Sequence, residues 1–445
     1  MSNLISYNPA NGEVVGEVGI TSLESLSQVI ADAKQAQAAW AQQSLAERSR
    51  IITRAYQGLE PSLELMAKLI SQEMGKHFRR ASYEAKGSIQ NAAYLAAEVE
   101  SALKSERLVG GSEIQYRPLG VVAVISPWNY PLAMANNLII PALMAGNSVI
   151  LKPSEETPLV ADHFVEALCE ILPKGVLQVV HGRADVGQAL VEQDINMVAF
   201  TGSIATGKNI MENAASGLKR LVMELGGNDA MIVMHNADIQ AAARFAVANS
   251  FENAGQMCIS TERVYVHQAI AAEFEAQVVR VAQRYHFGPW NNPGVKIGPL
   301  VNKKQHQKAM AQLQDAQDKG AQFLLGDVSY QPPFIPATVI SGMTPGMLLE
   351  QEETFAPVVA IARVKSMEEA VQRANDSVYG LGAVVFGGEG AAEVAEQLEV
   401  GMVSVNKGLG GSGESPWVGA KQSGFGFHGS ANGHRQFAQV RVINF

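Results

Sequence analysis

The chain has 445 residues, of which 47% are hydrophobic and 17% are charged. That composition is typical of a large folded protein and excludes an intrinsically disordered chain, and at about 150 residues per domain the length predicts two or three domains. Acidic residues outnumber basic residues by 43 to 34, and the net charge of −9 disfavours an extended nucleic-acid-binding surface. The two cysteines are too few for a disulfide framework.

No segment typical of targeting or membrane insertion is visible. The first residues lack a basic stretch followed by an apolar one, so no signal peptide is predicted. The longest apolar stretch, near 131–151, is broken by Pro141 and Gly146, too early to span a bilayer. We therefore expect a soluble, cytoplasmic protein with neither a membrane nor a nucleic acid as partner.

The first hundred residues carry apolar side chains at helical spacing. This pattern predicts three helices, over 22–40, over 47–74 with Gly75 as the stop, and over 82–103. Beyond residue 120, short β-branched runs alternate with helical segments. Strands are predicted at 120–126, 148–151, 176–180, 197–200 and 220–223. The alternation predicts a parallel sheet, and such sheets bind ligands beyond the carboxyl ends of their strands.

A second alternating block covers roughly 227–425. Its predicted strands are 230–234, 264–266 and 358–362, and the glycine-rich stretch 408–413 is predicted to be a loop. The predicted fold class is therefore α/β throughout, with two α/β units in the chain.

Two glycine patterns are similar to nucleotide-binding motifs. Gly424–Gly429 satisfies G-x-G-x-x-G, but the sixteen residues that follow it are too few for the βαβ unit that the motif requires. Gly202–Lys208 follows a strand and matches a P-loop, yet Asn209 replaces the Ser or Thr that would hold Mg²⁺. A P-loop NTPase is thus disfavoured, while the backbone N–H groups of a helix start still suit a phosphate anion.

Three residues are candidates for catalysis, and each has a plain structural alternative. Cys258 follows Asn-Ala-Gly-Gln-Met, a small and polar approach that would expose a thiol to a ligand, whereas Cys169 lies on the apolar face of a helix and is expected to be inert. Glu224 follows a strand and precedes two glycines, and Asn129 lies in a Trp-Asn-Tyr-Pro stretch, so both residues could simply form turns. No histidine lies near Cys258 in the sequence and no metal-ligand spacing appears, so neither a Cys/His hydrolase nor a metal site is predicted.

Together these segments resemble the aldehyde dehydrogenase superfamily, along nearly the whole chain. The motifs occur in the order of that family: Pro127-Trp-Asn-Tyr-Pro131, Lys152-Pro-Ser-Glu155, Phe200-Thr-Gly-Ser203, Glu224-Leu-Gly-Gly227, Gly255-Gln-Met-Cys258, Glu353-Thr-Phe355-Ala-Pro357 and Ser423-Gly424. The interval of 34 residues from Glu224 to Cys258 is also the one that the family pattern expects.

The resemblance implies a catalytic role for each candidate. Cys258, as a thiolate, would attack the aldehyde carbon, and the Asn129 amide with the Cys258 backbone N–H would stabilise the oxyanion, a contact typically worth ~3–4 kcal/mol. Loss of hydride to the nicotinamide would leave a thioester on Cys258, and Glu224 would activate the water that hydrolyses it. Because the CoA-acylating branch of the superfamily lacks this glutamate, the resemblance implies a non-acylating enzyme.

The implied cofactor is NAD, with NADP as the alternative. The matching residues are Lys152 and Glu155 for the adenosine ribose, Gly202 and Ser203 for the pyrophosphate, Glu353 and Phe355 for the nicotinamide ribose, and Trp128 and Leu225 for the wall of the same channel. The carboxylate of Glu155 can accept hydrogen bonds from both ribose hydroxyls but repels a 2′-phosphate, so NAD is favoured.

The chain departs from the family where a proton relay is expected. Many members have a Lys nine residues after the oxyanion Asn and a Glu near the C-terminus, and this chain has Leu138 and His428 at those positions. Because both polar groups are missing together, any relay is expected to use water, the backbone or His428.

The substrate is the least determined part of the resemblance. The expected pocket residues are Tyr130, Met134, Asn137, Glu252, Met257 and Trp417. Succinic semialdehyde dehydrogenases use arginines where this chain has Asn137 and Glu252. The negative charge of Glu252 would repel a carboxylate and tolerate an amine, which favours an aminoaldehyde or a neutral aldehyde. The stretch 258–263 and the short chain resemble semialdehyde-oxidising members, so a succinic-semialdehyde-type substrate is the alternative.

The resemblance also implies three parts and an assembly. These are a Rossmann-like NAD(P)-binding domain of 1–98 and 119–226, a catalytic domain of 227–425, and a small β-hairpin oligomerisation arm of 99–118 and 426–445. An edge strand in such an arm needs a partner, so a homodimer or homotetramer is expected. The competing classes are a P-loop-like NTPase and a non-catalytic binding protein, and the intact candidate residues count against the second.

Overall fold

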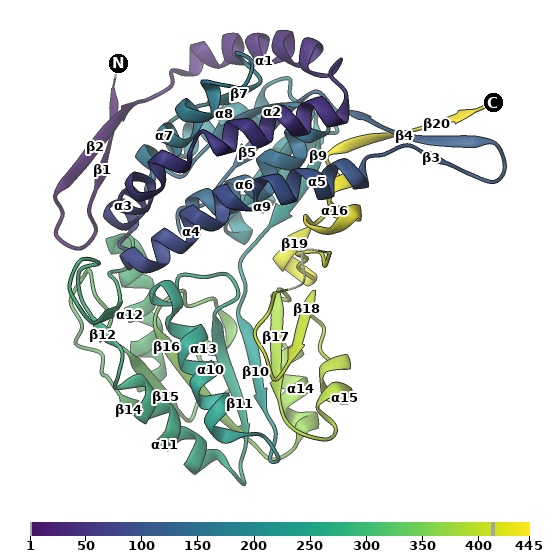
Figure 1. Ribbon diagram of the computed structural model, residues 1–445. Coiled ribbons are helices and arrows are strands. Elements are labelled where there is room, and N and C mark those ends of the chain that lie inside the picture. Colours follow the sequence, from purple (N-terminus) through teal and green to yellow (C-terminus); the bar gives the residue numbers. More distant parts are fainter. Residues whose placement is uncertain (1, 411–413) are drawn as a thin grey trace.

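The computed structural model describes residues 2–410 and 414–445, so the predicted loop at 408–413 lies partly outside the described residues. Figure 1 shows the strands β5 to β9 with their helices in the upper half of the molecule and the strands β10 to β18 in the lower half. The predicted α/β fold class is confirmed, because each half is built on a mainly parallel sheet.

The first sheet has six strands in the order β19-β9-β8-β5-β6-β7. Its strands are β5 (Val121–Ile125), β6 (Ser148–Lys152), β7 (Leu177–Val179), β8 (Met197–Thr201), β9 (Arg220–Glu224) and β19 (Gly424–Phe425). All pairs are parallel except β19 with β9. The five strands predicted for this region are confirmed, and β5 and β6 are buried almost throughout, as their runs of Val and Ile require.

Helices cover both faces of this sheet. They are α6 (Pro131–Met144), α7 (Pro158–Cys169), α8 (Ala184–Glu192) and α9 (Ile204–Ala215), which follow β5, β6, β7 and β8 in turn. From β5 the chain builds the sheet outward through β6 and β7 and then returns to place β8 on the other side of β5. Sheets of this kind open a ligand crevice where the strand order reverses, here between β5 and β8.

The N-terminal region differs from the prediction. An antiparallel hairpin of β1 (Asn3–Tyr7) and β2 (Val14–Gly19) precedes α1 (Leu26–Trp40), and it was not predicted because its strands are short and mostly exposed. The helix predicted over 47–74 is two helices, α2 (Leu45–Gln57) and α3 (Leu63–Met74). The break falls at Gly58 and at the turn that contains Pro61, because both residues disfavour a helix interior.

The helix predicted over 82–103 is also divided, into α4 (Phe78–Gln90) and α5 (Ala92–Ala102). Gly75 ends α3 in the left-handed conformation, as predicted from its place after the apolar pattern.

The second sheet has seven strands in the order β14-β15-β16-β11-β10-β17-β18, and only β14 is antiparallel to its neighbour. The strands are β10 (Asp229–Val233), β11 (Thr261–His267), β14 (Gln322–Leu325), β15 (Thr338–Ser341), β16 (Val358–Val364), β17 (Gly382–Phe386) and β18 (Met402–Val405). The predicted strands at 230–234, 264–266 and 358–362 are confirmed as β10, β11 and β16.

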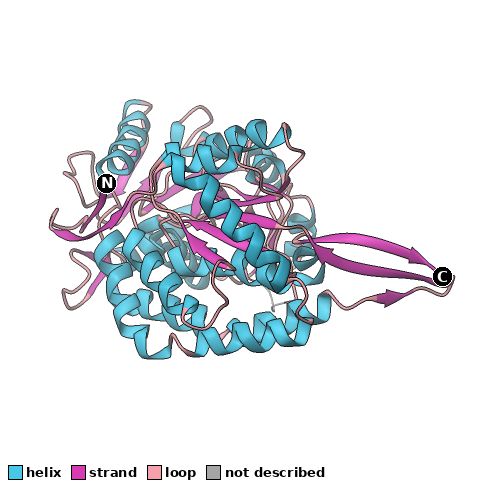
Figure 2. Ribbon diagram, turned by 90° about the horizontal axis from the view of Figure 1, so that it is seen from above, coloured by secondary structure: helices cyan, strands magenta, loops and turns pink. Residues whose placement is uncertain are grey.

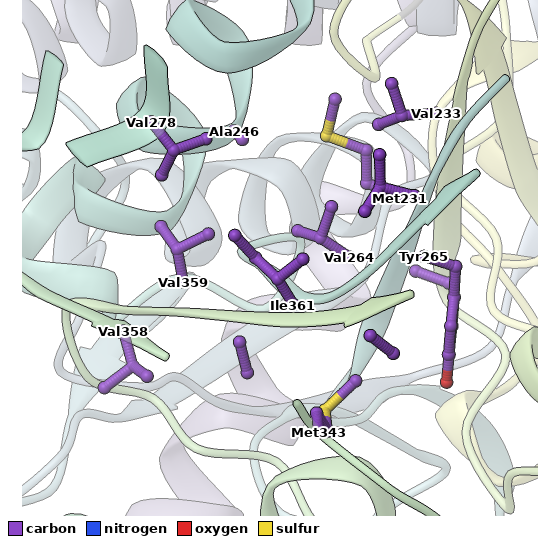
Figure 3. Packing of buried hydrophobic residues seen from close by; sticks show 14 of the residues in the cluster. Met231, Val233, Ala246, Val264, Tyr265, Val278, Met343, Val358, Val359 and Ile361 are labelled. Atoms are coloured by element: carbon purple, nitrogen blue, oxygen red, sulfur yellow. The ribbon is translucent and has the colours of Figure 1, made fainter. Parts of the chain in front are cut away.

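The helices beside this sheet are α10 (Ile239–Phe251), α11 (Ala271–Ala282), α12 (Lys303–Asp318), α13 (Leu348–Gln351), α14 (Met367–Asn375) and α15 (Ala391–Glu396), and β12 (His286–Phe287) pairs with β13 (Val295–Ile297). Figure 3 shows Val359 and Ile361 of β16 on the side of Val278 and Ala246, which lie on α11 and α10. These side chains belong to one buried cluster that holds the helices on the sheet.

A three-stranded antiparallel sheet forms the arm, which projects from the body in Figure 2. It contains β3 (Glu106–Arg107), β4 (Ser112–Pro118) and β20 (Ala438–Asn444), with β20 paired to β4 over its whole length. The short helix α16 (Ser430–Arg435) leads into β20. Within the described residues, no helix is both long enough and apolar enough to cross a bilayer.

Candidate active site

A cavity of about 870 Å³ lies beyond the carboxyl ends of β5, β6 and β8, at the place where the strand order reverses. Its opposite wall is the start of α12, which contributes Lys304, Gln305 and Lys308. The predicted cofactor residues on its wall are Trp128, Lys152, Glu155, Gly202 and Ser203. The place and the volume of this cavity fit a dinucleotide.

Gly202 and Ser203 form the entrance to α9. The Ser203 hydroxyl caps the helix by accepting a hydrogen bond from the backbone N–H of Thr206 (3.3 Å). A Cβ atom on Gly202 would lie 2.4 Å from the Phe200 ring, so the turn between β8 and α9 has room only for glycine. The P-loop-like match therefore lies at a helix start on a cavity wall, where free backbone N–H groups suit a pyrophosphate.

Lys152 and Glu155 lie together after β6. The Lys152 ammonium donates a hydrogen bond to the Pro153 carbonyl (2.9 Å) and lies 3.8 Å from a Glu155 carboxylate oxygen. Burial lowers the pKa of Lys152, while Glu155 acts in the opposite direction. One buried donor beside one acceptor fits the paired hydroxyls of a ribose.

Glu353 and Phe355 lie on a turn that Glu262 holds in place. The backbone N–H groups of Thr354 and Phe355 each donate to the Glu262 carboxylate at 2.7 Å. Phe355 has a left-handed φ of 56°, and its ring meets Trp128 edge to face with the centroids 5.7 Å apart. This contact joins the second sheet to the rim of the cofactor cavity. The sequence offered no functional signal for Glu262, although it lies within the stretch 258–263.

Cys258 lies on a loop with unusual backbone geometry. Asn253, Ala254 and Gly255 are consecutive residues with positive φ angles of 52°, 57° and 74°. Such strain is retained where the surrounding structure fixes a functional segment. Gly227 packs on the same loop, since a Cβ atom there would lie 2.3 Å from the Cys258 carbonyl oxygen.

The Cys258 side chain is a thiol at neutral pH. Burial, followed by the carboxylates of Asp229 and Glu353, raises the pKa of this thiol to about 12, and the backbone N–H groups of Ile259 and Cys258 act in the opposite direction. Burial also raises the pKa of Glu353, which accepts a hydrogen bond from the backbone N–H of Gly227 (3.1 Å). A nucleophile in this environment needs a base to remove its proton.

Asn129 connects the loop after β5 to the cysteine loop. Its side-chain amide nitrogen donates to the Gln256 backbone carbonyl (3.0 Å), and the backbone carbonyl of Asn129 accepts from the Asn253 side-chain amide (3.1 Å) and from the Lys76 ammonium (2.7 Å). An amide nitrogen carries two hydrogens, so one N–H of Asn129 remains for an oxyanion beside Cys258.

Lys76 supports this arrangement without any clear signal in the sequence. Its ammonium is fully buried, pairs with Glu84 and lies 3.6 Å from the centre of the Tyr130 ring. Glu84 also accepts the backbone N–H of Leu132 (3.1 Å) at the start of α6. Burial lowers the pKa of Lys76 and Glu84 opposes that shift. The neighbouring Gly75 indicates a helix end but does not indicate a buried ion pair.

Glu224 ends β9 beside the two-residue strand β19. Gly424 pairs with Glu224, and the backbone N–H of Leu225 donates to the Ser423 carbonyl (2.9 Å). The G-x-G-x-x-G match at 424–429 therefore belongs to a segment that packs beside Glu224. His428 of this segment contacts the Glu224 carboxylate through its Nε2 atom, and both side chains are buried.

Leu225 and Leu138, which the family resemblance also singled out, pack inside the fold. Leu225 packs on α9, where a Cβ atom on Gly207 would lie 2.7 Å from the Leu225 side chain. Leu138 is buried in the apolar core on α6 and offers no proton-carrying group. Cys169 is half-buried, and its thiol donates to the Leu177 carbonyl (3.3 Å).

A second cavity, of about 470 Å³, lies between α4 and the start of α6. Three of the predicted pocket residues line it, namely Tyr130, Asn137 and Glu252. Met257 joins them through Tyr130, whose hydroxyl donates to the Met257 sulfur (3.7 Å). Met134 is half-buried on α6 and is not part of this wall, and Trp417 stacks on His428 instead.

An ion pair changes the electrostatics of this second cavity. Arg80 of α4 lies 2.8 Å from the Glu252 carboxylate, and 56% of its side chain is exposed. Burial raises the pKa of Glu252, and Arg80 and Lys76 oppose that shift. Glu252 therefore does not present an uncompensated negative charge, which corrects the expectation that it repels a carboxylate. The two residues are far apart in the sequence, so no local pattern indicated the pair.

The fold and the arrangement of these groups define an NAD(P)-dependent oxidoreductase with a cysteine at the junction of its two sheets. The family model described as "Aldehyde dehydrogenase family" matches residues 2–443, and the chain belongs to this family. The resemblance inferred from the motifs is thereby confirmed, together with the activity class, an NAD(P)-dependent aldehyde dehydrogenase.

Curated and solved relatives agree with this assignment. A mitochondrial succinate-semialdehyde dehydrogenase of Arabidopsis thaliana is 35% identical over 451 residues, which cover 98% of this chain and 85% of the relative. The structure of an NADP-dependent glyceraldehyde-3-phosphate dehydrogenase from Bacillus halodurans has a TM-score of 0.95 at 32% identity, covering 99% of this chain and 95% of that one. A betaine aldehyde dehydrogenase from Staphylococcus aureus, solved with NAD+, has a TM-score of 0.93 at 30% identity, with coverages of 99% and 91%.

Proposed function

We propose that the chain oxidises an aldehyde to the free carboxylic acid, with Cys258 as nucleophile, Asn129 as oxyanion donor and Glu224 as general base. One observation carries the proposal: the Asn129 amide bonds to the cysteine loop at Gln256, and Gly227 packs on the Cys258 carbonyl. Gly227 is three residues from Glu224, a separation of about 11 Å at most along the backbone. We infer from this proximity that all three groups serve one reaction centre.

The residues act in sequence on the substrate. The Cys258 thiol loses its proton to solvent water, and the thiolate attacks the aldehyde carbon while the free N–H of Asn129 and the backbone N–H of Cys258 stabilise the oxyanion. The bound nicotinamide supplies the acceptor for the hydride of the aldehyde carbon, which leaves a thioester on Cys258. Glu224 then takes a proton from water as the water attacks the thioester, and the acid leaves as the Cys258 sulfur regains a proton.

NAD is the cofactor that we propose for this site. Lys152 and Glu155 would hold the adenosine ribose, the start of α9 at Gly202 and Ser203 would hold the pyrophosphate, and Glu353 and Phe355 would hold the nicotinamide ribose beside Trp128 and Leu225. Glu155 would repel a 2′-phosphate, so kcat/KM is expected to be higher with NAD than with NADP. Glu155→Gln should reduce the ratio of kcat/KM with NAD to kcat/KM with NADP, and an unchanged ratio would contradict the role of Glu155.

A short aldehyde that carries a carboxylate is the substrate class that we propose. Arg80 compensates Glu252 and uses one nitrogen to do so, which leaves other guanidinium N–H groups as donors beside the second cavity. The succinate-semialdehyde relative supports the same class. An aminoaldehyde, attracted by Glu252, is the competing class.

An aldehyde panel tests both parts of this proposal. Succinic semialdehyde, 4-aminobutanal and butanal share a four-carbon chain, and the absorbance of the reduced cofactor reports their turnover with NAD and with NADP. Succinic semialdehyde is expected to have the highest kcat/KM. No turnover with any aldehyde would refute aldehyde oxidation, and a preference for 4-aminobutanal would refute only the substrate class.

We also propose that the three parts divide the work as 1–98 and 119–226 for NAD(P), 227–425 for catalysis, and 99–118 with 426–445 for pairing with a second copy. β20 is an edge strand of the arm and exposes Val440 and Val442, and Phe445 directly after it is exposed as well. A free strand edge with apolar side chains pairs readily with another chain. Light scattering is expected to show a homodimer or homotetramer, and Val442→Asp to shift the mass toward the monomer.

A further inference from the structure

We propose that His428 is a positioning residue for Glu224: its imidazole N–H donates to one carboxylate oxygen and leaves the other oxygen to receive a proton from the hydrolytic water. This inference rests on the proposed role of Glu224 as general base. It concerns how the base is held, which neither the family model nor the names of the relatives specify.

The first support is the isolation of the two groups from any other partner. His428 Nε2 contacts Glu224 Oε1, and the two side chains are only 8% and 7% exposed. Over residues 2–410 and 414–445, neither of these two atoms makes a hydrogen bond of ordinary geometry, and their contact with each other is the close polar contact that they share. Buried polar atoms are costly when left unpaired, so each of the two is the partner available to the other.

The second support is that contacts hold both the ring and the backbone of His428. Trp417 stacks on it with a centroid distance of 6.4 Å and an interplanar angle of 14°, and the Trp417 backbone N–H donates to the His428 carbonyl (2.8 Å). Behind it, a Cβ atom on Gly433 would lie 2.7 Å from the His428 carbonyl carbon. The backbone of His428 is therefore fixed on two sides, and Trp417 lies against the ring itself.

The third support is the register of the segment that carries His428. Gly424 pairs with Glu224 and Phe425 with Met223, and the hydroxyl of Ser423 donates to the Gly226 carbonyl (2.7 Å). Figure 1 shows β19 and α16 next to the end of β9. β19 is fixed on the strand that ends in Glu224. Because His428 is only three positions after Phe425, its imidazole lies next to that carboxylate.

The protonation state of the His428 imidazole determines whether it acts as a hydrogen-bond donor or as a base. The titratable groups that face it are Glu224 from β9 and His434 from α16. Burial, followed by the influence of His434, lowers the pKa of His428 to about 3, so the ring is neutral at physiological pH. A neutral imidazole protonated at Nε2 is a hydrogen-bond donor to the carboxylate and does not compete with it as the base.

Kinetics of two substitutions separate positioning from a structural role. In His428→Ala, the first turnover of NADH is expected to stay within about twofold, while kcat falls about tenfold or more because hydrolysis of the thioester is slowed. His428→Gln, whose amide can still donate to Glu224, is expected to recover most of the loss. Acid quench and intact mass spectrometry should show the acyl-enzyme accumulating in His428→Ala.

The pH profile gives a readout that simple loss of stability would not produce. A carboxylate that loses a hydrogen-bond donor is harder to ionise, so the acid limb of kcat is expected to move to higher pH in His428→Ala and to return in His428→Gln. His181→Gln is the matched control, because the imidazole of His181 is also buried and contacts a carboxylate, that of Asp162 rather than Glu224, and it should leave kcat and the limb unchanged.

A double substitution decides whether His428 acts through Glu224. Adding His428→Ala to Glu224→Gln should cause no further loss of thioester hydrolysis. Wild-type kcat and an unmoved acid limb in His428→Ala would overturn the inference, as would an equal loss in the Glu224→Gln background. If the unsubstituted chain formed no NADH from any aldehyde, the proposed function itself would fall, which is a different result.

Discussion

The two sides of the proposed reaction centre differ in the contacts that build them, close packing at glycines on one side and side-chain ion pairs on the other. On the cofactor side, glycines let backbone approach closely: Gly202 faces the Phe200 ring, and Gly227 packs on the Cys258 carbonyl. On the side that we propose for the substrate there are two ion pairs, Lys76 with Glu84 and Arg80 with Glu252. Lys76 and Glu84 also bond to the main chain, at the Asn129 carbonyl and the Leu132 N–H, whereas Arg80 and Glu252 contact each other through their side chains. We therefore expect the choice of substrate to depend on Arg80 and Glu252, separately from the groups that carry the chemistry.

Removal of the nucleophile is the most severe test of that separation. Cys258→Ala is expected to lower aldehyde-dependent NADH formation by about 10⁴-fold or more. The affinity for NAD, measured by calorimetry, should stay within about twofold, because the thiol is not part of the cofactor cavity. A comparable loss of NAD affinity would contradict this separation, since it would show that the cofactor side and the substrate side are coupled through Cys258.

Loss of the oxyanion donor should be the next largest effect. Asn129→Ala is expected to lower kcat by about 10²–10³-fold, as for other single oxyanion donors. The substitution also removes the bond to the Gln256 carbonyl, so a thermal melt should accompany the kinetics. An unaffected kcat would exclude Asn129 from the reaction.

The high pKa of the Cys258 thiol sharpens the comparison through pH. Only the thiolate reacts with iodoacetamide, and a thiol with a pKa of about 12 gains thiolate with every increase in pH. Alkylation without cofactor is expected to accelerate about tenfold per pH unit between pH 7 and 9, with no plateau. A Cys169→Ser background restricts the signal to Cys258, and a plateau below pH 8 would show that the thiol ionises readily.

The smallest effect is expected on the substrate side. Arg80→Gln should raise KM for succinic semialdehyde about tenfold and leave butanal within about twofold, because a single charge-assisted hydrogen bond is lost. Steady-state kinetics with both aldehydes measure the difference. Glu252→Gln is the matched change on the other partner of the ion pair, and it should not raise KM for succinic semialdehyde. Equal changes for the two aldehydes would assign Arg80 a purely structural role.

The sequence predicts those parts of the fold and site that depend on local pattern. The β-branched runs at Val121–Ile125 and Ser148–Lys152 identify strands because burial on both faces demands them. The small, polar approach to Cys258 makes it a candidate nucleophile, and its place at a strand end makes Glu224 a candidate, because ligands of parallel sheets meet at those ends. Neighbouring residues carry the whole signal in each case.

Contacts between distant segments are what the sequence could not supply. Arg80 meets Glu252 and His428 meets Glu224 only after the chain has folded, and neither pair has a fixed spacing that a pattern could express. Helix breaks are intermediate: Gly58 and Pro61 explain the end of α2, while the division between α4 and α5 at Asn91 has no strong local cause. The ion pair of Arg80 with Glu252 thus corrected the expectation that the charge of Glu252 is uncompensated.

The pairing of β19 with β9 has a consequence for protein synthesis. β9 leaves the ribosome about two hundred residues before Gly424 and Phe425. The outer edge of β9 at Glu224 therefore stays unpaired while most of the second sheet is synthesised. A strand edge with free N–H and C=O groups is a template for misassembly with other nascent chains. Slower expression, or a chaperone that shields exposed edges, is therefore expected to increase the yield of native protein, and an inducer and temperature series in the host cell would show it.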